Sequence, residues 1–272
     1  MHNGRAVHSC NLAFVHSCIR AFRPVADSVL AVLLAPCCAA CGQLLERPTM
    51  GPVCPSCWRS ILPLTPPVCD RCGDPLPTWR AISVPLARCP RCRRGTRRVD
   101  RARAVGAYDG ALRAIVHALK YEGRRSLAQP LAELMRFRGA DMLTGADWAV
   151  PVPLHPSRRR ERGFNQAADL ARHVGVPVRQ ALRRTRATRM QTGLPAAQRH
   201  RNVRGAFELA SSGRERQERR EGRQGLEGSV VVLIDDVSTT GATLDACARV
   251  LKEGGVREVR ALTAARVVTP PH

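Results

Sequence analysis

Hydrophobic positions in the second half of the chain follow two different periods. Residues 230–234 are apolar without alternation, which is typical of a strand buried on both faces of a parallel sheet. From residue 244 the apolar positions fall at i, i+3, i+4 and i+7, which predicts an amphipathic helix that the glycine pair 254–255 ends. Residues 256–263 predict the next strand. The stretch is therefore a β–loop–α–β unit whose loop lies at the carboxyl end of a strand.

Earlier segments extend the same α/β pattern. Residues 149–152 predict a second buried strand, and residues 108–123 predict a helix with one apolar face. A further helix follows residue 165, with Asn165 placed to cap it. In open α/β sheets ligands bind beyond the carboxyl ends of the strands, so the loop after residue 234 is the first place to look for a site.

The loop after residue 234 combines an acidic pair with small and hydroxylated residues. A turn of this composition at the start of a helix presents backbone N–H groups and the positive end of the helix dipole, which suits a phosphate. It lacks the lysine of a Walker loop, and G-x-G-x-x-G is absent from the chain. Two carboxylates beside a bound phosphate need another partner, such as a ribose diol or Mg²⁺. A ligand that offers all three groups is 5-phosphoribosyl-1-pyrophosphate (PRPP). The predicted binding residues are Asp235, Asp236, Ser238, Thr239, Thr240, Gly241, Ala242 and Thr243.

Residues 36–95 have no hydrophobic period and are rich in cysteine and proline. Eight of the twelve cysteines form four C-x-x-C pairs, and the spacings between pairs are those of zinc ribbons. We predict about two structural zinc ions, held by pairs taken in sequence order, although interleaved pairing fits the same spacings. Disulfides are the alternative, and they require an oxidising compartment. The predicted ligands are Cys38, Cys41, Cys54, Cys57, Cys69, Cys72, Cys89 and Cys92. Cys247 is expected in the core of the helix that follows the acidic loop.

The N-terminal residues 1–35 are predicted to be a tail followed by a short apolar helix. The apolar run at 25–38 has the length of a signal-peptide core, but Asp27 interrupts its start and no small-x-small cleavage site follows. The run is also too short to span a membrane. We therefore expect a helix packed on the protein, no membrane span and a cytoplasmic location.

The net charge of the chain adds little information about its function. The formal net charge is +22, but only two of the 44 basic residues are lysines, a skew that a GC-rich genome explains as well as nucleic-acid contact does. Residues 211–227 mix both signs around few apolar positions, so we predict a disordered surface loop between two strands.

The motif "VVLIDDVSTTGAT" resembles the PRPP-binding signature of type I phosphoribosyltransferases. The segments "PVPLHPSRRRERGFNQAADLA" and "RMQTGLPAAQRHRNVRGAF", with the cysteine-rich front end, resemble the ComF family of competence and DNA-uptake proteins. The resemblance covers residue 36 to the C-terminus. It implies a Rossmann-like parallel-sheet phosphoribosyltransferase domain at 96–272 behind a double zinc-ribbon-like module at 36–95, and a role in DNA uptake on the cytoplasmic side of the inner membrane.

The resemblance also assigns residues to roles. It implies a pyrophosphate loop after residue 152, and a mobile loop at 184–205 that closes over PRPP and excludes water. Lys120 matches a K-x-x-G pattern of the family, and Gln191 and Asn202 match its loop pattern. The residues implied to bind PRPP through these elements are His155, Arg158, Arg162 and Lys120, and those implied to act catalytically are Asp235, Asp236 and Arg199.

Two functions follow. The first is a Mg²⁺-dependent phosphoribosyltransferase in which an unknown acceptor displaces pyrophosphate. The alternative is a catalytically weak or inactive PRPP sensor that binds single-stranded DNA or a DNA-uptake helicase. Base-salvage transferases carry a hood that recognises the acceptor, and here the zinc module or residues 96–110 would have to supply it.

Overall fold

The computed structural model describes residues 23–76, 88–95, 97–186, 203, 205–210 and 225–268. It divides into two units, Met1–Arg59 and Ser60–His272. The first cysteine cluster lies in the first unit, whereas the second cluster lies in the same unit as the main sheet. The module boundary at residue 95 stays a prediction.

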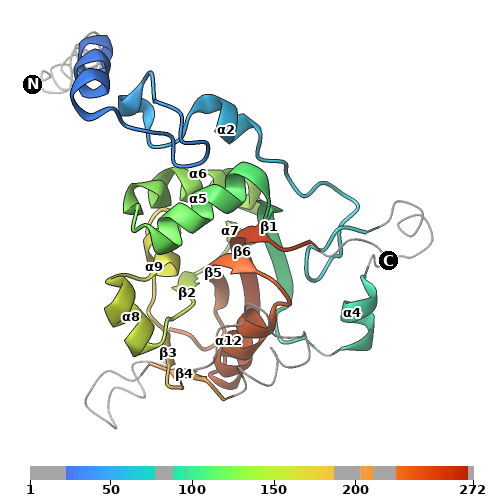
Figure 1. The fold of residues 1–272 in the computed structure, drawn as a ribbon. Coiled ribbons are helices and arrows are strands. Elements are labelled where there is room, and N and C mark those ends of the chain that lie inside the picture. Colours follow the sequence, from blue (N-terminus) through green and yellow to red (C-terminus); the bar gives the residue numbers. More distant parts are fainter. Residues whose placement is uncertain are drawn as a thin grey trace, which may run out of the picture. The chain divides into compact units, whose positions relative to one another are not determined.

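Four parallel strands form the main sheet in the order β1-β6-β5-β2 (Figure 1). The strands are β1 (Arg101–Ala107), β2 (Trp148–Pro151), β5 (Val230–Ser238) and β6 (Glu258–Arg266). The expected α/β architecture is confirmed. Both central strands run past their predicted apolar runs, since Asp235 pairs with Thr263 and Ser238 pairs with Arg266. The acidic pair therefore belongs to the last part of β5 rather than to the loop after it.

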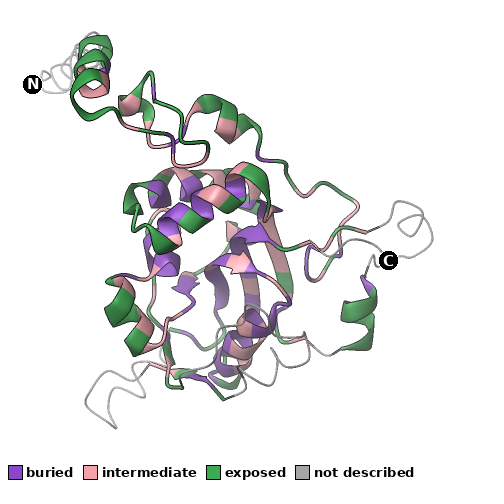
Figure 2. Ribbon diagram, in the orientation of Figure 1, coloured by how far each residue is buried: buried purple, intermediate pink, exposed green. Residues whose placement is uncertain are grey.

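Helices cover both faces of the sheet, with α5 and α6 on one side and α12 on the other (Figure 1). The helices of this unit are α4 (Pro90–Arg94), α5 (Gly110–Tyr121), η2 (Arg125–Leu127), α6 (Ala128–Arg138), α7 (Ala140–Leu143), α8 (Pro156–Arg162), α9 (Gln166–Ala171) and α12 (Ala242–Glu253). Leu233 of β5 and Leu251 of α12 are fully buried in one core cluster, and so is Cys247, as predicted. Burial of each leucine contributes about 2 kcal/mol. The purple strands and helix faces of Figure 2 show this core.

An antiparallel hairpin of β3 (Leu182–Arg184) and β4 (Phe207–Leu209) packs with α12. The predicted mobile loop at 184–205 connects these two strands. Most of it, including Gln191, Arg199 and Asn202, lies outside the described residues. The predicted loop at 211–227 connects β4 with β5, and of it the structure describes only the turn at 225–227.

The source of an acceptor hood, the zinc module or residues 96–110, stays a prediction. Arg101–Ala107 is strand β1 at one edge of the main sheet. An edge strand leaves part of its side chains exposed. Arg101 is exposed and pairs with Asp141 at 3.2 Å, while Val105 is buried.

The first unit contains a short helix at residues 23–34, η1 (Pro48–Met50) and α2 (Pro55–Arg59). The expectation that this helix packs its apolar side chains on the protein is wrong, since Val32, Leu33 and Leu34 are largely exposed. The buried Asp27 carboxylate accepts a hydrogen bond from the Thr49 backbone N–H at 2.8 Å, which ties the helix to η1. In the described part of the chain, no helix has the length and apolar character needed to cross a membrane.

Candidate functional site

The carboxyl end of β5 carries two adjacent carboxyls, and α5 brings a lysine to them. Lys120 lies in the last turn of α5, and its Nζ is 2.7 Å from Asp236 Oδ2. The side chain of Asp236 is only 4% exposed. Lys120, which the family resemblance assigns to the site, thus lies against the acidic pair.

The two carboxyls have opposite protonation tendencies. Burial raises the pKa of Asp235, and the negative charge of Asp236 raises it further. Burial also acts to raise the pKa of Asp236, but the Lys120 ammonium more than offsets this and the pKa is lowered. Likewise, burial acts against the charged form of Lys120, while the Asp236 charge holds the pKa of the lysine above its ordinary value. One carboxylate is therefore paired and ionised beside another that resists ionisation.

The turn after β5 is built as an anion cradle. Gly241 has a φ of +79° and opens α12, so the amides of the first turn of this helix are available to a ligand. Asp236 Oδ2 is buried and has the Lys120 ammonium as its ion-pair partner. Ser238 Oγ is also buried, and within the described ranges it has no hydrogen-bond partner. A buried hydroxyl in this state indicates a site that a ligand completes.

Basic side chains from α8 approach the same end of the sheet. The Arg162 guanidinium lies 5.5 Å from the centroid of the Tyr121 ring, and Lys120 Nζ lies 5.9 Å from it. Arg162 also donates to Gln166 Oε1 at 2.6 Å. His155 caps α8, because its Nδ1 accepts from the Ser157 backbone N–H at 3.3 Å. The implied pyrophosphate loop thus begins a helix whose last turn lies beside α5.

The interpretation of Asn165 as a helix cap is confirmed. Its Oδ1 accepts from the Ala167 backbone N–H at 3.1 Å, and its Nδ2 donates to the Val152 carbonyl at 3.1 Å. These two bonds join the end of β2 to the start of α9 and fix the segment that carries α8.

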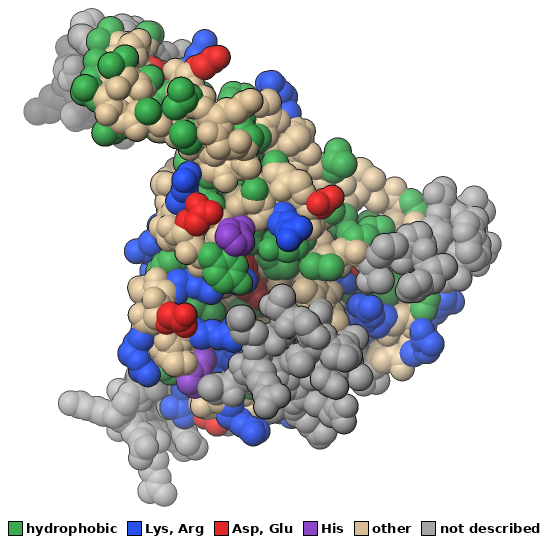
Figure 3. Space-filling view, in the orientation of Figure 1, with side chains coloured by type: hydrophobic (Ala, Val, Ile, Leu, Met, Phe, Trp, Pro, Cys, Tyr) green, Lys and Arg blue, Asp and Glu red, His purple; other side chains and the backbone are tan. Residues whose placement is uncertain are grey.

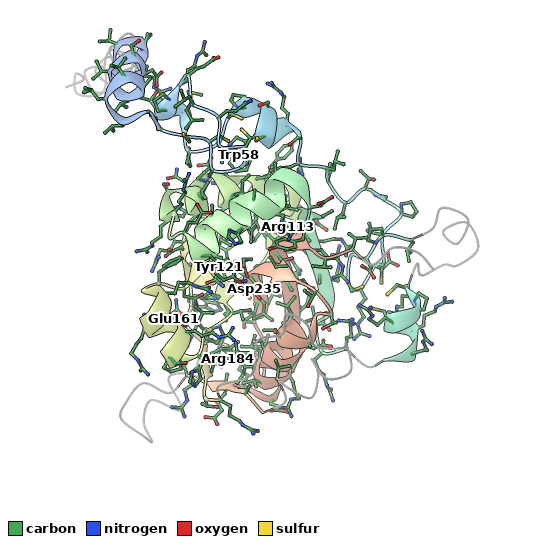
Figure 4. The ribbon with its side chains drawn as sticks, viewed as in Figure 1. Trp58, Arg113, Tyr121, Glu161, Arg184 and Asp235 are labelled. Carbon is green, nitrogen blue, oxygen red and sulfur yellow. The ribbon has the colours of Figure 1, made fainter. Side chains whose placement is uncertain are left out.

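Sequence reasoning missed Arg184 on β3. Its guanidinium lies 5.3 Å from the centroid of the Phe207 ring. Burial lowers the pKa of Arg184, the charge of Arg158 lowers it further, and the charge of Asp235 opposes the shift. Figure 4 shows Arg184 and Tyr121 on either side of Asp235 in this view. No sequence signal distinguished this arginine from 41 others.

A cavity of about 510 Å³ lies between the α8 segment and β3. Its basic lining comes from both elements: Arg159, Arg160, Arg183 and Arg184. In Figure 3 acidic atoms lie in a hollow of the surface and basic side chains gather at its edge.

The cysteines form two four-cysteine clusters in sequence order. One contains the pairs at 38/41 and 54/57, the other the pairs at 69/72 and 89/92, and within each the sulfur atoms lie within 4.8 Å of one another. The Cys41–Cys54 and Cys72–Cys89 sulfurs are 3.9 and 3.7 Å apart. Tetrahedral zinc with Zn–S bonds of about 2.3 Å places sulfurs about 3.8 Å apart, so both clusters fit the metal.

Local backbone geometry supports the same assignment. Gly42 and Gly73 follow the first pair of each cluster with φ of +74° and +70°, the left-handed turn of a knuckle. None of the cysteines in the described part forms a disulfide.

A parallel sheet with an acidic pair and a small-residue turn at the end of a central strand defines a phosphoribosyltransferase domain, here preceded by two four-cysteine sites. The family model for the phosphoribosyl transferase domain matches residues 160–269, and that for the double zinc ribbon domain matches residues 29–93. The chain belongs to the ComF family of competence proteins.

Two relatives show how far the similarity extends. Competence protein F of Haemophilus influenzae is 29% identical over 79% of this chain and 90% of its own length. The DNA utilization protein YhgH of Salmonella typhimurium is 30% identical over 82% of this chain and 93% of its own length. Among solved structures, the allosteric regulatory enzyme of purine biosynthesis matches with a TM-score of 0.34 and 20% identity, over 54% of this chain and 30% of that one.

Proposed function

We propose that this protein binds PRPP together with Mg²⁺ and transfers the phosphoribosyl group to an acceptor. The observation that carries the proposal is the end of β5, where an ionised Asp236 is paired with Lys120 and the buried Ser238 hydroxyl has no hydrogen-bond partner among the described residues. A ligand with a diol and a phosphate matches this site, because the carboxylates suit the diol and the turn suits the phosphate.

Each part of the site has a distinct role in this proposal. The turn from Thr239 to Thr243 binds the 5′-phosphate through its amides and hydroxyls, and Asp235 and Asp236 bind the ribose hydroxyls. Bound Mg²⁺ supplies positive charge to the pyrophosphate. His155, Arg158 and Arg162 are placed on the α8 segment to bind the same group, and two arginines with charge-assisted hydrogen bonds match its oxygens well.

The reaction breaks the bond between the anomeric carbon and the pyrophosphate oxygen while the acceptor forms a new bond to that carbon. The pyrophosphate leaves with the bonding electrons. Since the transition state has oxocarbenium character, water must be kept out of the site. The loop between β3 and β4, which contains Arg199, is proposed to cover the site during this step.

We infer a role in DNA uptake from the relatives, whose names refer to competence and DNA utilization. In this role the protein acts on the cytoplasmic side of the membrane, with single-stranded DNA or an uptake helicase as partner. A second candidate function is PRPP-dependent DNA binding without turnover. The cavity with four arginines favours it, since guanidinium groups recognise phosphodiesters.

A turnover assay separates these functions. Pyrophosphate release from PRPP is followed against a panel of bases, nucleosides and single-stranded DNA. Release that depends on one acceptor and is lost in the Asp235→Ala/Asp236→Ala variant supports the transferase. Tight PRPP binding without release, together with PRPP-dependent DNA binding, rejects turnover and leaves the second function.

A further inference from the structure

Arg97 reaches the phosphate cradle from the segment that precedes β1. Its Nη2 donates to the Thr240 carbonyl at 3.0 Å, and its Nη1 is 3.9 Å from Asp245 Oδ2. A Cβ atom added to Gly241 would lie 2.5 Å from Nη1, so the guanidinium sits directly against the glycine of the turn. The side chain is 8% exposed, and its Nε has no hydrogen-bond partner in the part of the chain that the structure describes.

The backbone beside Arg97 is fixed to the same helix. Asp245, in the first turn of α12, accepts from the backbone N–H groups of Arg98 at 2.9 Å and of Val99 at 3.2 Å. The segment 97–99 therefore lies across the start of α12, where the amides of the cradle are.

A residue of the second zinc cluster holds this segment from its other side. Arg71, between the ligands Cys69 and Cys72, donates from Nη2 to the Arg97 carbonyl at 2.6 Å and from Nε to the Val99 carbonyl at 3.3 Å. The geometry of this C-x-x-C knuckle therefore sets the position of the Arg97 backbone.

A second connection joins the same knuckle to the end of the sheet. Arg266, the neighbour of Ser238 in the sheet, contacts Asp74 Oδ1 at 2.8 Å and Cys72 Sγ at 3.8 Å. Its side chain is 4% exposed. Both the start of α12 and the end of β5 are thus tied to the residues around Cys72.

We propose that the second four-cysteine site is a positioning element of the phosphate cradle. Zinc orders the Cys69–Cys72 knuckle, Arg71 then fixes the backbone of residue 97, and the Arg97 side chain holds the turn at Thr240 and Gly241 in the conformation that binds a phosphate. Arg71 and Arg97 are positioning residues in this arrangement. The identity of the ligand rests on the proposed function, but the coupling itself is a property of the ligand-free protein.

The physical basis is that zinc binding supplies much of the folding free energy of such modules, so the knuckle is less ordered without the metal. When the knuckle is disordered, the backbone of Arg71 is no longer held in place. The turn at Thr240 and Gly241 then has fewer contacts that restrict its conformation. A ligand would have to order the turn itself and would bind more weakly.

The first test uses hydrogen exchange of the ligand-free, zinc-loaded protein. Arg71→Ala is compared with Arg91→Ala, because Arg91 is exposed and occupies the same position in the Cys89–Cys92 knuckle. Zinc content is measured in both variants. We expect faster exchange of the amides at 239–245 in Arg71→Ala alone, with zinc retained in both. Unchanged exchange in Arg71→Ala overturns the proposal.

The second test measures PRPP affinity by calorimetry in Arg71→Ala, Arg97→Ala and the double variant. We expect about a tenfold loss in each single variant, the usual size of coupling between sites, and no further loss in the double variant, because Arg71 acts through Arg97. Losses of PRPP affinity that add up in the double variant overturn the proposal that Arg71 acts through Arg97. Wild-type protein that binds no PRPP rejects the proposed function instead, and the exchange experiment then decides the coupling alone.

Discussion

Asp235 and Asp236 are neighbours on β5, yet their surroundings differ. Asp236 has the Lys120 ammonium at 2.7 Å, whereas Asp235 is partly buried next to an existing negative charge. The acidic pair was predictable because it directly follows an apolar run. Arg97 and Arg184 were not, because arginine is so frequent in this chain that its identity at one position carries little information.

The raised pKa of Asp235 predicts proton release on ligand binding. A carboxyl with a pKa above its ordinary value keeps its proton as the pH rises until that pKa is passed, and binding of Mg²⁺ with PRPP favours the ionised form. Affinity should therefore increase with pH through the folded-state pKa. Calorimetry in buffers of different ionisation enthalpy measures the released proton.

Asp235→Asn is the control for this prediction, because PRPP also has ionisable phosphate oxygens. The variant should lose the part of the proton release that belongs to the carboxyl and keep the rest. Equal proton release in wild type and variant would contradict the prediction that Asp235 loses its proton on binding.

At the scale of elements, β5, the turn and α12 were predictable because their signals are continuous in sequence: an apolar run, an acidic pair, small residues, and then a helical period. Strand β1 was not, because as an edge strand it alternates arginine with small residues and its pairing with β6 is set by tertiary contacts. The hairpin of β3 and β4 is similarly short, and its three-residue strands carry no period.

Gly241→Ala tests the cradle as an element. Alanine at a φ of +79° costs about 1 kcal/mol of folding free energy, and its Cβ would displace the Arg97 guanidinium, which lies 2.5 Å away. Gly145→Ala has a similar backbone strain at a φ of +69° but no atom within 4 Å of the added Cβ. We expect a loss of thermal stability in both variants, larger in Gly241→Ala because the Arg97 contacts are also lost, and a loss of PRPP affinity in Gly241→Ala only. Equal affinities would contradict the role of this turn.

At the scale of the whole molecule, the chain consists of two units with one four-cysteine site each. The cysteine spacings predicted both sites in sequence order, because a C-x-x-C knuckle is local and each cluster joins neighbouring knuckles. The sequence did not predict that the second four-cysteine site would share a unit with the sheet. This arrangement depends on contacts between residues far apart in the chain, such as Arg266 and Asp74.

The zinc assignment predicts two zinc ions per chain by metal analysis of protein purified from cytosol without added reductant. Each site should contribute on the order of 10 kcal/mol to the folding of its own segment, so a strong chelator should unfold both cysteine segments. The loss of zinc is followed by thiol titration, and eight additional reactive thiols are expected after chelation. A zinc content near zero with oxidised cysteines would favour disulfides.

The most direct test of the central claim is calorimetry with PRPP and Mg²⁺ on the wild-type protein and on Asp236→Asn. The substitution keeps the shape of the side chain but removes the charge that Lys120 pairs with. The account predicts saturable binding of PRPP to the wild type and at least about a tenfold weaker binding to the variant, as expected when one member of a buried charge pair is lost. Indistinguishable heats from the two proteins, whether both bind or neither does, would contradict the assignment of this site to PRPP.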